Sequence, residues 1–321
     1  MELSDQLILA AMTTNTAIRK LNTLLTSFER RRPMRAGSLI VTVYGDAIVP
    51  RGGSLWLGSL LDMMAGFGVE PGLVRTALSR LVTDGWFERE RLGKHSYYRL
   101  SAQRAAEFAA ATTRIYRASE PAWSGEMDIA IITSPDAALR GAHRDRMLRL
   151  GYGQAAANVM LRPRVNGICS EPPIDSDQVI SMVTQSESEE KVKALAQACW
   201  QLDELATAYG NFLKAFGPVA QEITDGAHLS GAQAFQLRVL LIHDWRRILL
   251  RDPLLPHKML PADWPGTSAR ALIAGVYRRI LGDSERWLDL HAIDQNGALP
   301  SPSADLEQRF LGSSDVELHK T

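Results

Sequence analysis

The sequence predicts an α+β protein with a winged helix-turn-helix near its N-terminus, a small mixed middle domain and a helical C-terminal domain. Three short helical patterns precede an aromatic-rich hairpin pattern at 36–100. A strand, an amphipathic helix and two further strands follow between 123 and 186, and helix-period patterns continue from 187. We expect an N-terminal extension, the winged helix, a connector helix, the middle domain and the C-terminal domain at 1–35, 36–101, 102–122, 123–186 and 187–321.

The composition is that of a globular protein in a reducing compartment. The 321 residues are 45% hydrophobic and 22% charged, and this length fits two or three domains. No apolar run approaches the ~20 residues of a membrane-spanning helix, and the acidic first residues do not suit a secretory signal. Cys169 and Cys199 supply neither a disulfide framework nor a cysteine-rich zinc site. We therefore expect a cytoplasmic protein.

Charge is unevenly distributed although the formal net charge is zero. Residues 1–120 contain 16 Lys and Arg against 11 Asp and Glu, whereas the remaining residues contain 20 against 25. A basic N-terminal part on an acidic body is typical of a nucleic-acid-binding module attached to a larger protein. The extension has apolar residues at helical spacing (18, 21, 25 and 28) before a basic run at 30–32, which is either a phosphate contact or a solvated linker.

Turn and cap residues delimit the elements of the predicted winged helix. A first helix spans 38–49, and Ser54 is expected to cap a second helix that glycines end at 66 and 68. The third helix runs from Pro71 to Gly85, with a predicted apolar stripe at 73, 77, 78 and 81. Two aromatic-rich runs around the turn at 92–94 then predict a β-hairpin, and an alanine-rich helix at 102–120 connects it to the middle domain.

The predicted DNA contacts lie on the third helix, on the hairpin and before the second helix. Arginine in a recognition helix makes bidentate hydrogen bonds to guanine, and hairpin tips contact the minor groove or the backbone. A phosphate is expected at the N-terminus of the second helix, unless that segment is only a tight turn and its cap. The alternative for the others is an ordinary solvated surface. The candidates are Arg51, Ser54, Arg75, Thr76, Ser79, Arg80, Arg91, Lys94 and His95.

An enzymatic function has little support in the sequence. No nucleophile elbow, zinc-protease, Walker A or dinucleotide motif occurs, and the seven histidines lack metal-ligand spacing, so we expect no catalytic residue and no metal. Asp128 lies in the first strand of the middle domain, where a nuclease carboxylate is conceivable, but its apolar neighbours indicate a strand-edge residue. A protein-binding scaffold that only retains the winged fold is the other alternative.

From about 36 to 310 the chain resembles the PaaX family, repressors of bacterial phenylacetate catabolism. The resemblance rests on YGDAIVPRGGSLWLGSL at 44–60, VRTALSRLVTDGW at 74–86, IYRASEPAWSGE at 115–126 and LLIHDWRRILLRDPLLPHKMLPADWPG at 240–266. It implies a ferredoxin-like middle domain, which is abbreviated here between 164 and 178. It also implies a dimeric repressor without a cofactor, released from its DNA operator by an aryl-coenzyme A thioester such as phenylacetyl-CoA.

Given this resemblance, a cationic stripe on the helix at 231–251 is a candidate binding site for the phosphates of coenzyme A. Nearby aromatic side chains are candidates for contact with the acyl group. The alternative is that Asp244 pairs with Arg247, and that Asp252 pairs with Arg251 or with a neighbouring helix. The effector is expected between the middle and C-terminal domains, and we expect a homodimer. The effector candidates are Trp200, Tyr209, His243, Trp245, Arg246, Arg247 and Arg251.

Overall fold

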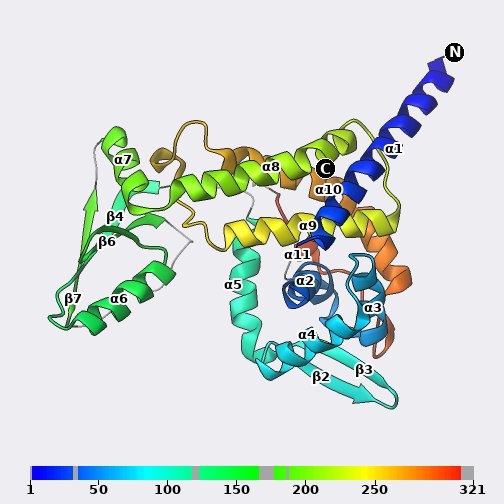
Figure 1. The fold of residues 1–321 in the computed structure, drawn as a ribbon, viewed down its shortest axis with the longest axis horizontal. Coiled ribbons are helices and arrows are strands. Elements are labelled where there is room, and N and C mark those ends of the chain that lie inside the picture. The colour runs from blue at the N-terminus through cyan, green and yellow to red at the C-terminus, as the bar shows by residue number, and fades with distance from the viewer. Residues whose placement is uncertain (1, 32–34, 118–122, 166–176, 186–187, 312–321) are drawn as a thin grey trace. The chain divides into compact units, whose positions relative to one another are not determined.

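The computed structural model describes residues 2–31, 35–117, 123–165, 177–185 and 188–311 (Figure 1). The chain divides into two compact units. Unit 1 comprises Met1–Ala118, Asn211–Leu250 and Ser268–Thr321, and unit 2 comprises Ser119–Gly210 and Arg251–Thr267. Within the described ranges, none of the helices combines the length and the apolar composition needed to cross a bilayer.

The first half of unit 1 contains a helix–hairpin segment, residues 36–100. Its helices are α2 (Ala36–Val43), α3 (Leu57–Ala65) and α4 (Pro71–Thr83), and a π-helical turn (Tyr44–Ile48) and a 3-10 turn (Val49–Arg51) extend α2. Its strands are β1 (Ser54–Trp56), β2 (Phe87–Leu92) and β3 (His95–Leu100). They form an antiparallel sheet in the order β1-β3-β2. The predicted three helices and hairpin are thus present.

Two local predictions in this segment are wrong. Ser54 does not cap α3, because it begins β1 opposite Arg99, and the residue before α3 is Trp56, whose side chain makes no capping hydrogen bond. The predicted buried stripe of α4 is right at Leu78 and wrong at its first residue, because Val74 rather than Leu73 faces the interior. Val74 and Leu78 are fully buried, whereas the predicted Leu73 is 39% exposed.

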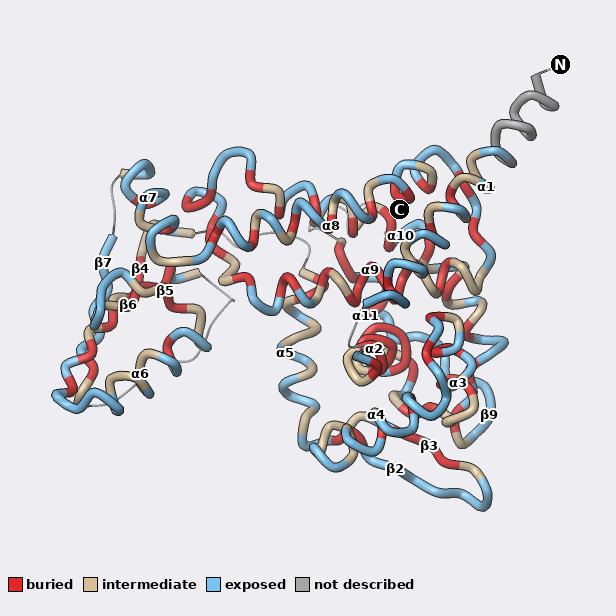
Figure 2. The backbone as a smooth tube through the Cα atoms, viewed as in Figure 1, coloured by how far each residue is buried: buried red, intermediate tan, exposed pale blue. Residues whose placement is uncertain are grey.

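The other helices of unit 1 pack around α9 (Gly231–Leu249). Residues 237–243 of α9 are buried without interruption, so every face of this helix is covered (Figure 2). A capping box formed by Ser230 and Gln233 begins it. Besides the helix–hairpin segment and α9, unit 1 contains all or most of α1 (Glu2–Glu29), α5 (Ala105–Tyr116), α8 (Leu202–Thr224), α10 (Pro265–His291), β8 (Ile293–Asp294), β9 (Gly297–Ala298) and α11 (Ala304–Glu307). A 3-10 turn (Ala102–Arg104) precedes α5.

The N-terminal extension is a helix that is fastened to this core. Leu21 is fully buried and Phe28 is 5% exposed, which confirms the helical spacing of apolar residues in α1. At its end the Arg31 guanidinium makes two hydrogen bonds, of 2.6 and 2.7 Å, to the Asp244 carboxylate on α9. This pair replaces the predicted pairing of Asp244 with Arg247. The second arginine of the basic run therefore contacts an acidic side chain of the protein itself.

Unit 2 is built on a four-stranded antiparallel sheet in the order β5-β6-β4-β7. Its elements are β4 (Trp123–Ile132), α6 (Ala137–Arg149), β5 (Gly153–Ala156), β6 (Val159–Val165), β7 (Val179–Gln185), α7 (Glu189–Cys199) and a 3-10 turn (His257–Met259). The predicted strand, helix and two later strands are confirmed, and β5 was not predicted. The core between α6 and the sheet contains Ala130, Ile132, Met147, Tyr152 and Met160. A second helix of the ferredoxin-like kind would fall at 166–176, outside the described residues.

Candidate nucleic-acid interface

The outer face of α4 carries two arginines that pair with no carboxylate in the described part of the chain. Pro71 occupies the first turn of α4, where its missing N–H is harmless, and Val74 and Leu78 fix the inner face. Arg75 and Arg80 are exposed on the other side, and neither has an ion pair among the described residues. A helix that keeps two unpaired guanidinium groups in solvent presents strong donors to an anionic partner.

Two smaller polar residues lie between these arginines on the exposed face. Thr76 donates its hydroxyl to the Gly72 carbonyl at 2.9 Å, which holds the side chain against the helix and leaves the oxygen as an acceptor. Ser79 is exposed, and its carbonyl accepts the hydroxyl of Thr83 at 3.0 Å. The four predicted contact residues of α4 therefore share one solvent-accessible surface.

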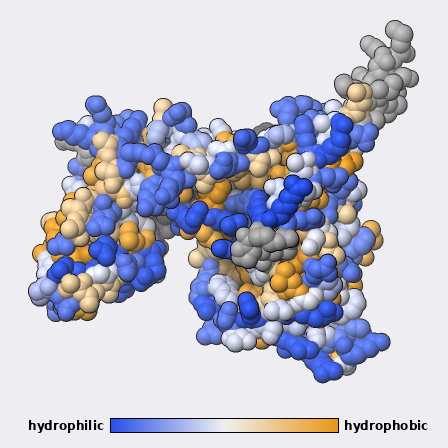
Figure 3. Space-filling model, in the orientation of Figure 1, coloured by the Kyte–Doolittle hydropathy of each residue, from blue (hydrophilic) through white to orange (hydrophobic). Residues whose placement is uncertain are grey.

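The β2–β3 hairpin places a second set of polar side chains in solvent. Gly93 has φ +59°, a left-handed conformation that the tight turn requires and glycine adopts freely. Lys94 beside it is exposed, and Arg91 is exposed with its Nε donating to the Gly93 carbonyl at 3.3 Å. His95 is half-buried, with its ring 5.4 Å from that of Trp56. The hairpin surface is hydrophilic in the space-filling view (Figure 3).

Arg51 and Ser54 lie inside the protein, which corrects the predicted phosphate contacts before α3. Arg51 is 1% exposed, and its guanidinium pairs with Glu285 at 2.9 Å and with Asp289. Its Nε donates to the Pro300 carbonyl at 2.9 Å. Ser54 is 4% exposed. The Arg51 donors are therefore occupied, and the Ser54 hydroxyl is buried, so neither side chain is accessible to a phosphate.

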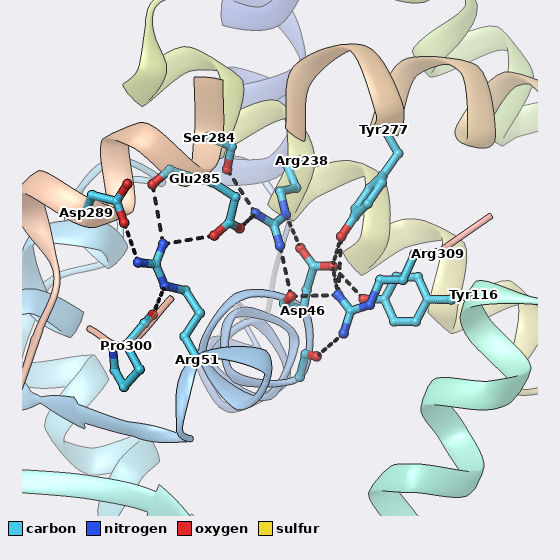
Figure 4. Close-up of polar contacts among 11 residues, drawn as sticks. Asp46, Arg51, Tyr116, Arg238, Tyr277, Ser284, Glu285, Asp289, Pro300 and Arg309 are labelled. Carbon is cyan, nitrogen blue, oxygen red and sulfur yellow. Dashed lines mark hydrogen bonds and ion pairs between the residues drawn. The ribbon is translucent and has the colours of Figure 1, made fainter. Parts of the chain in front are cut away.

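A buried ionic network attaches the helix–hairpin segment to the helices of unit 1 (Figure 4). Its centre is Asp46, in the π-helical turn after α2, which is 1% exposed. Its carboxylate accepts hydrogen bonds from Arg238 on α9 at 2.6 Å and from Arg309 at 2.9 Å. The hydroxyls of Tyr116 and Tyr277 also donate to it, at 2.6 and 2.9 Å. A buried carboxylate needs such a set of donors to remain charged.

The network continues to Arg51 through one more carboxylate. Glu285 on α10 accepts from both Arg238 and Arg51, so the acids and the bases alternate along the chain of contacts. Burial raises the pKa of the Tyr116 hydroxyl well above its usual range, so this group remains a donor to Asp46. The helix–hairpin segment is consequently positioned by α9, α10 and the C-terminal end of the described chain. No local pattern in the sequence predicts this network, because its partners are far apart along the chain.

The predicted effector residues of unit 1 do not form an exposed cationic stripe. His243 is 3% exposed, and its burial is the main cause that lowers its pKa from 6.5 to about 3. It is therefore neutral at physiological pH. Trp245 is fully buried, and Arg246 is half-buried with Nη2 donating to the Ser38 carbonyl and hydroxyl at 3.1 and 2.9 Å. Only Arg247 of these four is exposed.

The remaining predicted effector residues belong to unit 2. Trp200 donates its Nε1 to the Gly151 carbonyl at 3.2 Å. The Tyr209 hydroxyl donates to Asp252 at 2.5 Å, so Asp252 contacts the neighbouring helix α8, one of the two expected alternatives, rather than Arg251. Because α9 ends before Arg251, this arginine is not part of the helical stripe. These contacts give both aromatic side chains a role in the packing of unit 2.

Asp128 is an ion-paired residue of an inner strand and not a strand-edge residue. Its strand, β4, lies between β6 and β7. Its carboxylate accepts from Arg162 at 3.0 Å and from Arg164 at 2.9 Å, and the side chain is buried. Two guanidinium groups already neutralise it, which makes it a poor ligand for a divalent cation. In the described part of the chain, no three His, Cys, Asp or Glu side chains gather as a metal site would require.

Known proteins resemble the chain over most of its length. The family described as PaaX-like protein matches residues 35–104, and the PaaX-like protein C-terminal domain matches residues 200–290. The chain is 33% identical over 302 residues to the transcriptional repressor PaaX of Escherichia coli (strain K12), covering 91% of this chain and 95% of that protein. Among solved structures, the uncharacterized protein Rv0674 from Mycobacterium tuberculosis is 26% identical, with a TM-score of 0.47, over 70% of this chain and 90% of that one.

Proposed function

The chain belongs to the PaaX family of transcriptional repressors, and we propose that it binds operator DNA through the helix–hairpin segment acting as a winged helix-turn-helix. The observation that carries the proposal is the exposed face of α4. Arg75 and Arg80 are exposed there without an ion pair among the described residues. In the major groove each would donate two hydrogen bonds to the O6 and N7 atoms of a guanine.

The hairpin has a different role in this proposal. Lys94 and Arg91 neutralise phosphates beside the groove that α4 occupies, with His95 next to them, and these contacts carry little sequence information. Thr76 and Ser79 complete the contact surface of α4. Arg51 and Ser54 leave the set of DNA contacts, because both are buried.

The regulated genes and the effector follow from the family resemblance. We propose that the protein represses genes of aromatic acid catabolism, phenylacetate in particular, and that an aryl-CoA such as phenylacetyl-CoA releases it. It acts on chromosomal DNA and thus in the cytoplasm, without catalysing a reaction. One winged helix covers too few base pairs for useful specificity, so we propose a symmetric dimer on a two-fold operator, a state that light scattering measures.

The test is the affinity for DNA fragments selected by the protein from a random-sequence pool, measured by fluorescence anisotropy at several salt concentrations. Arg80→Ala is expected to cost about 1–3 kcal/mol and to relax base preference at one position per half-site. Lys94→Ala is expected to weaken binding to every sequence and to lower the salt slope by about one unit. The matched control is Arg149→Ala on α6, another exposed helical arginine, which leaves affinity unchanged.

Three results would contradict the proposal. Equal affinity of the parent and of the Arg80 and Lys94 variants would remove α4 and the hairpin from the interface. A parent protein that selects no DNA would favour the scaffold alternative. DNA that is cut rather than retained would favour the nuclease alternative.

A further inference from the structure

A cavity of about 120 Å³ lies within unit 1 beneath the middle of α5. Its walls come from α2 and the π-helical turn, from α5 and from α9, and Trp86 between α4 and β2 contributes as well. Figure 1 shows α5 running from the helix–hairpin segment to α9. The apolar part of the lining is Val41, Phe108, Ala111, Ile115, Ile242 and Leu250. An apolar cavity of roughly 150 Å³ holds one benzene ring, so this one suits a single ring or a short chain.

The cavity lies beneath the middle of α5, because this helix contacts its neighbours near its two ends. At one end the Phe108 ring lies against Trp86, with centroids 6.3 Å apart. At the other end Trp245 donates Nε1 to the Ile115 carbonyl at 3.0 Å, and Arg114 donates Nε to the Leu249 carbonyl at 3.0 Å. Small side chains occupy the span between these contacts. Well-packed interiors contain few such voids, and an empty one lowers stability, so a ligand that fills it stabilises the fold.

One wall of the cavity carries a cation that the protein leaves incompletely paired. Arg246 lines the cavity, and its Nη2 rests on Ser38, while its Nε is buried without a hydrogen-bond partner. No carboxylate lies within ion-pair distance of it among the described residues. The two acids of the lining are occupied elsewhere, Asp46 in the ionic network and Glu107 by Arg104 at 2.7 Å. A half-buried guanidinium with spare donors favours an acceptor oxygen on the ligand.

We propose that this cavity binds a small carboxylic acid with one apolar ring, either free or as a thioester, with the ring in the cavity and the acyl oxygen near Arg246. The effect of the ligand on DNA binding rests on the repressor function proposed above. The binding of the ligand to the cavity does not depend on that function. The cavity wall includes α2 and Trp86, which belong to the segment proposed to read DNA. A ligand bound beneath α5 therefore favours one position of that segment. The ligand releases DNA when the segment cannot bind DNA in the position that the ligand favours.

The test is calorimetric titration of the full-length protein with phenylacetate, phenylacetyl-CoA and coenzyme A. The informative variant is Ala111→Leu, which fills the cavity from a half-buried position of α5, and the matched control is Ala110→Leu at the exposed neighbouring position. We expect the first to weaken binding about tenfold or more and the second to leave it unchanged. A second pair, Arg246→Met against the exposed Arg247→Met, removes one charge each, and only the first is expected to weaken binding by about tenfold.

The titration also identifies the source of the acyl group, because the free acid and the thioester are compared on the same variants. Thermal unfolding controls the fold, since Ala111→Leu is expected to raise the melting temperature of the ligand-free protein by filling a void. Binding of the acid and the thioester that is insensitive to Ala111→Leu would overturn the cavity proposal, as would no binding of any probe to the parent. DNA binding of the ligand-free proteins is measured separately. A parent that binds the ligand but not DNA would contradict the repressor function and leave the cavity assignment standing.

Discussion

Protonation of His243 is expected to oppose folding. The side chain is 3% exposed, its Nδ1 lies 3.0 Å from the Thr42 hydroxyl, and the Phe28 ring packs edge-on with its centroid 5.6 Å away. Burial is the largest cause that lowers its pKa from 6.5 to about 3, and neighbouring arginines lower it further. The perturbation is therefore acidification across the interval between these two values.

The sign and the size follow from proton linkage. In the unfolded chain the imidazole titrates near pH 6.5. Between this pH and about 3 the unfolded state therefore binds a proton at His243 and the folded state does not. Stability contributed by the neutral side chain is complete above pH 6.5 and is lost as the pH falls toward about 3. Each pH unit corresponds to about 1.4 kcal/mol, so lowering the pH to about 5 costs about 2 kcal/mol of unfolding free energy. Because the ring is buried, solvent screening does not reduce this figure.

The assay is urea unfolding, followed by circular dichroism at about pH 8, 6 and 5, of the parent and of His243→Gln. Glutamine keeps a hydrogen-bonding side chain beside Thr42 and does not titrate. All other ionisable groups are shared, so the difference between the two pH profiles isolates His243. Parallel profiles for the two proteins would refute the reasoning, because the parent alone is expected to lose the extra stability in acid.

Two further substitutions test the packing of each unit. Asp46→Asn leaves Arg238 and Arg309 buried without their carboxylate and is expected to cost about 3–5 kcal/mol in thermal unfolding; a loss below about 1 kcal/mol would contradict a charged network. Gly153→Ala places a Cβ 2.5 Å from the Trp200 ring, so it is expected to cost about 1–3 kcal/mol, with faster hydrogen exchange confined to unit 2. Its control, Gly210→Ala, meets nothing within 4 Å on α8 and is expected to be neutral or stabilising by up to about 1 kcal/mol; equal effects of the two would refute the steric argument.

Elements set by local chemistry were predicted well from the sequence. Pro71 and Gly85 delimit α4, and the aromatic-rich runs on either side of Gly93 produce the β2–β3 hairpin, because these signals act over a few residues. The exposed positions of Arg75 and Arg80 follow from the helical period alone. Whether those arginines touch bases stays a prediction.

The errors concern residues whose environment depends on distant parts of the chain. Ser54 looks like a helix cap, but its pairing with Arg99 places it in a strand. Arg51 looks like a solvent-facing cation, and its partner Glu285 is 234 residues away. His243 is followed closely by Arg246 and Arg247 in sequence, yet its ring is buried against Phe28 of α1 and Thr42 of α2. Periodicity assigns a residue to a face and cannot say what that face meets.

The position of Asp46 also determines how the protein can be dissected. A fragment ending after β3 would contain every residue proposed to contact DNA, and its 36–100 segment is about the size of small domains that fold alone. Cutting there would remove Arg238, Arg309 and Glu285, so Asp46 and Arg51 would lose the partners that compensate their charges in the interior. We therefore expect that the helix–hairpin segment does not fold stably by itself, because its buried charges are compensated by residues from the last third of the chain.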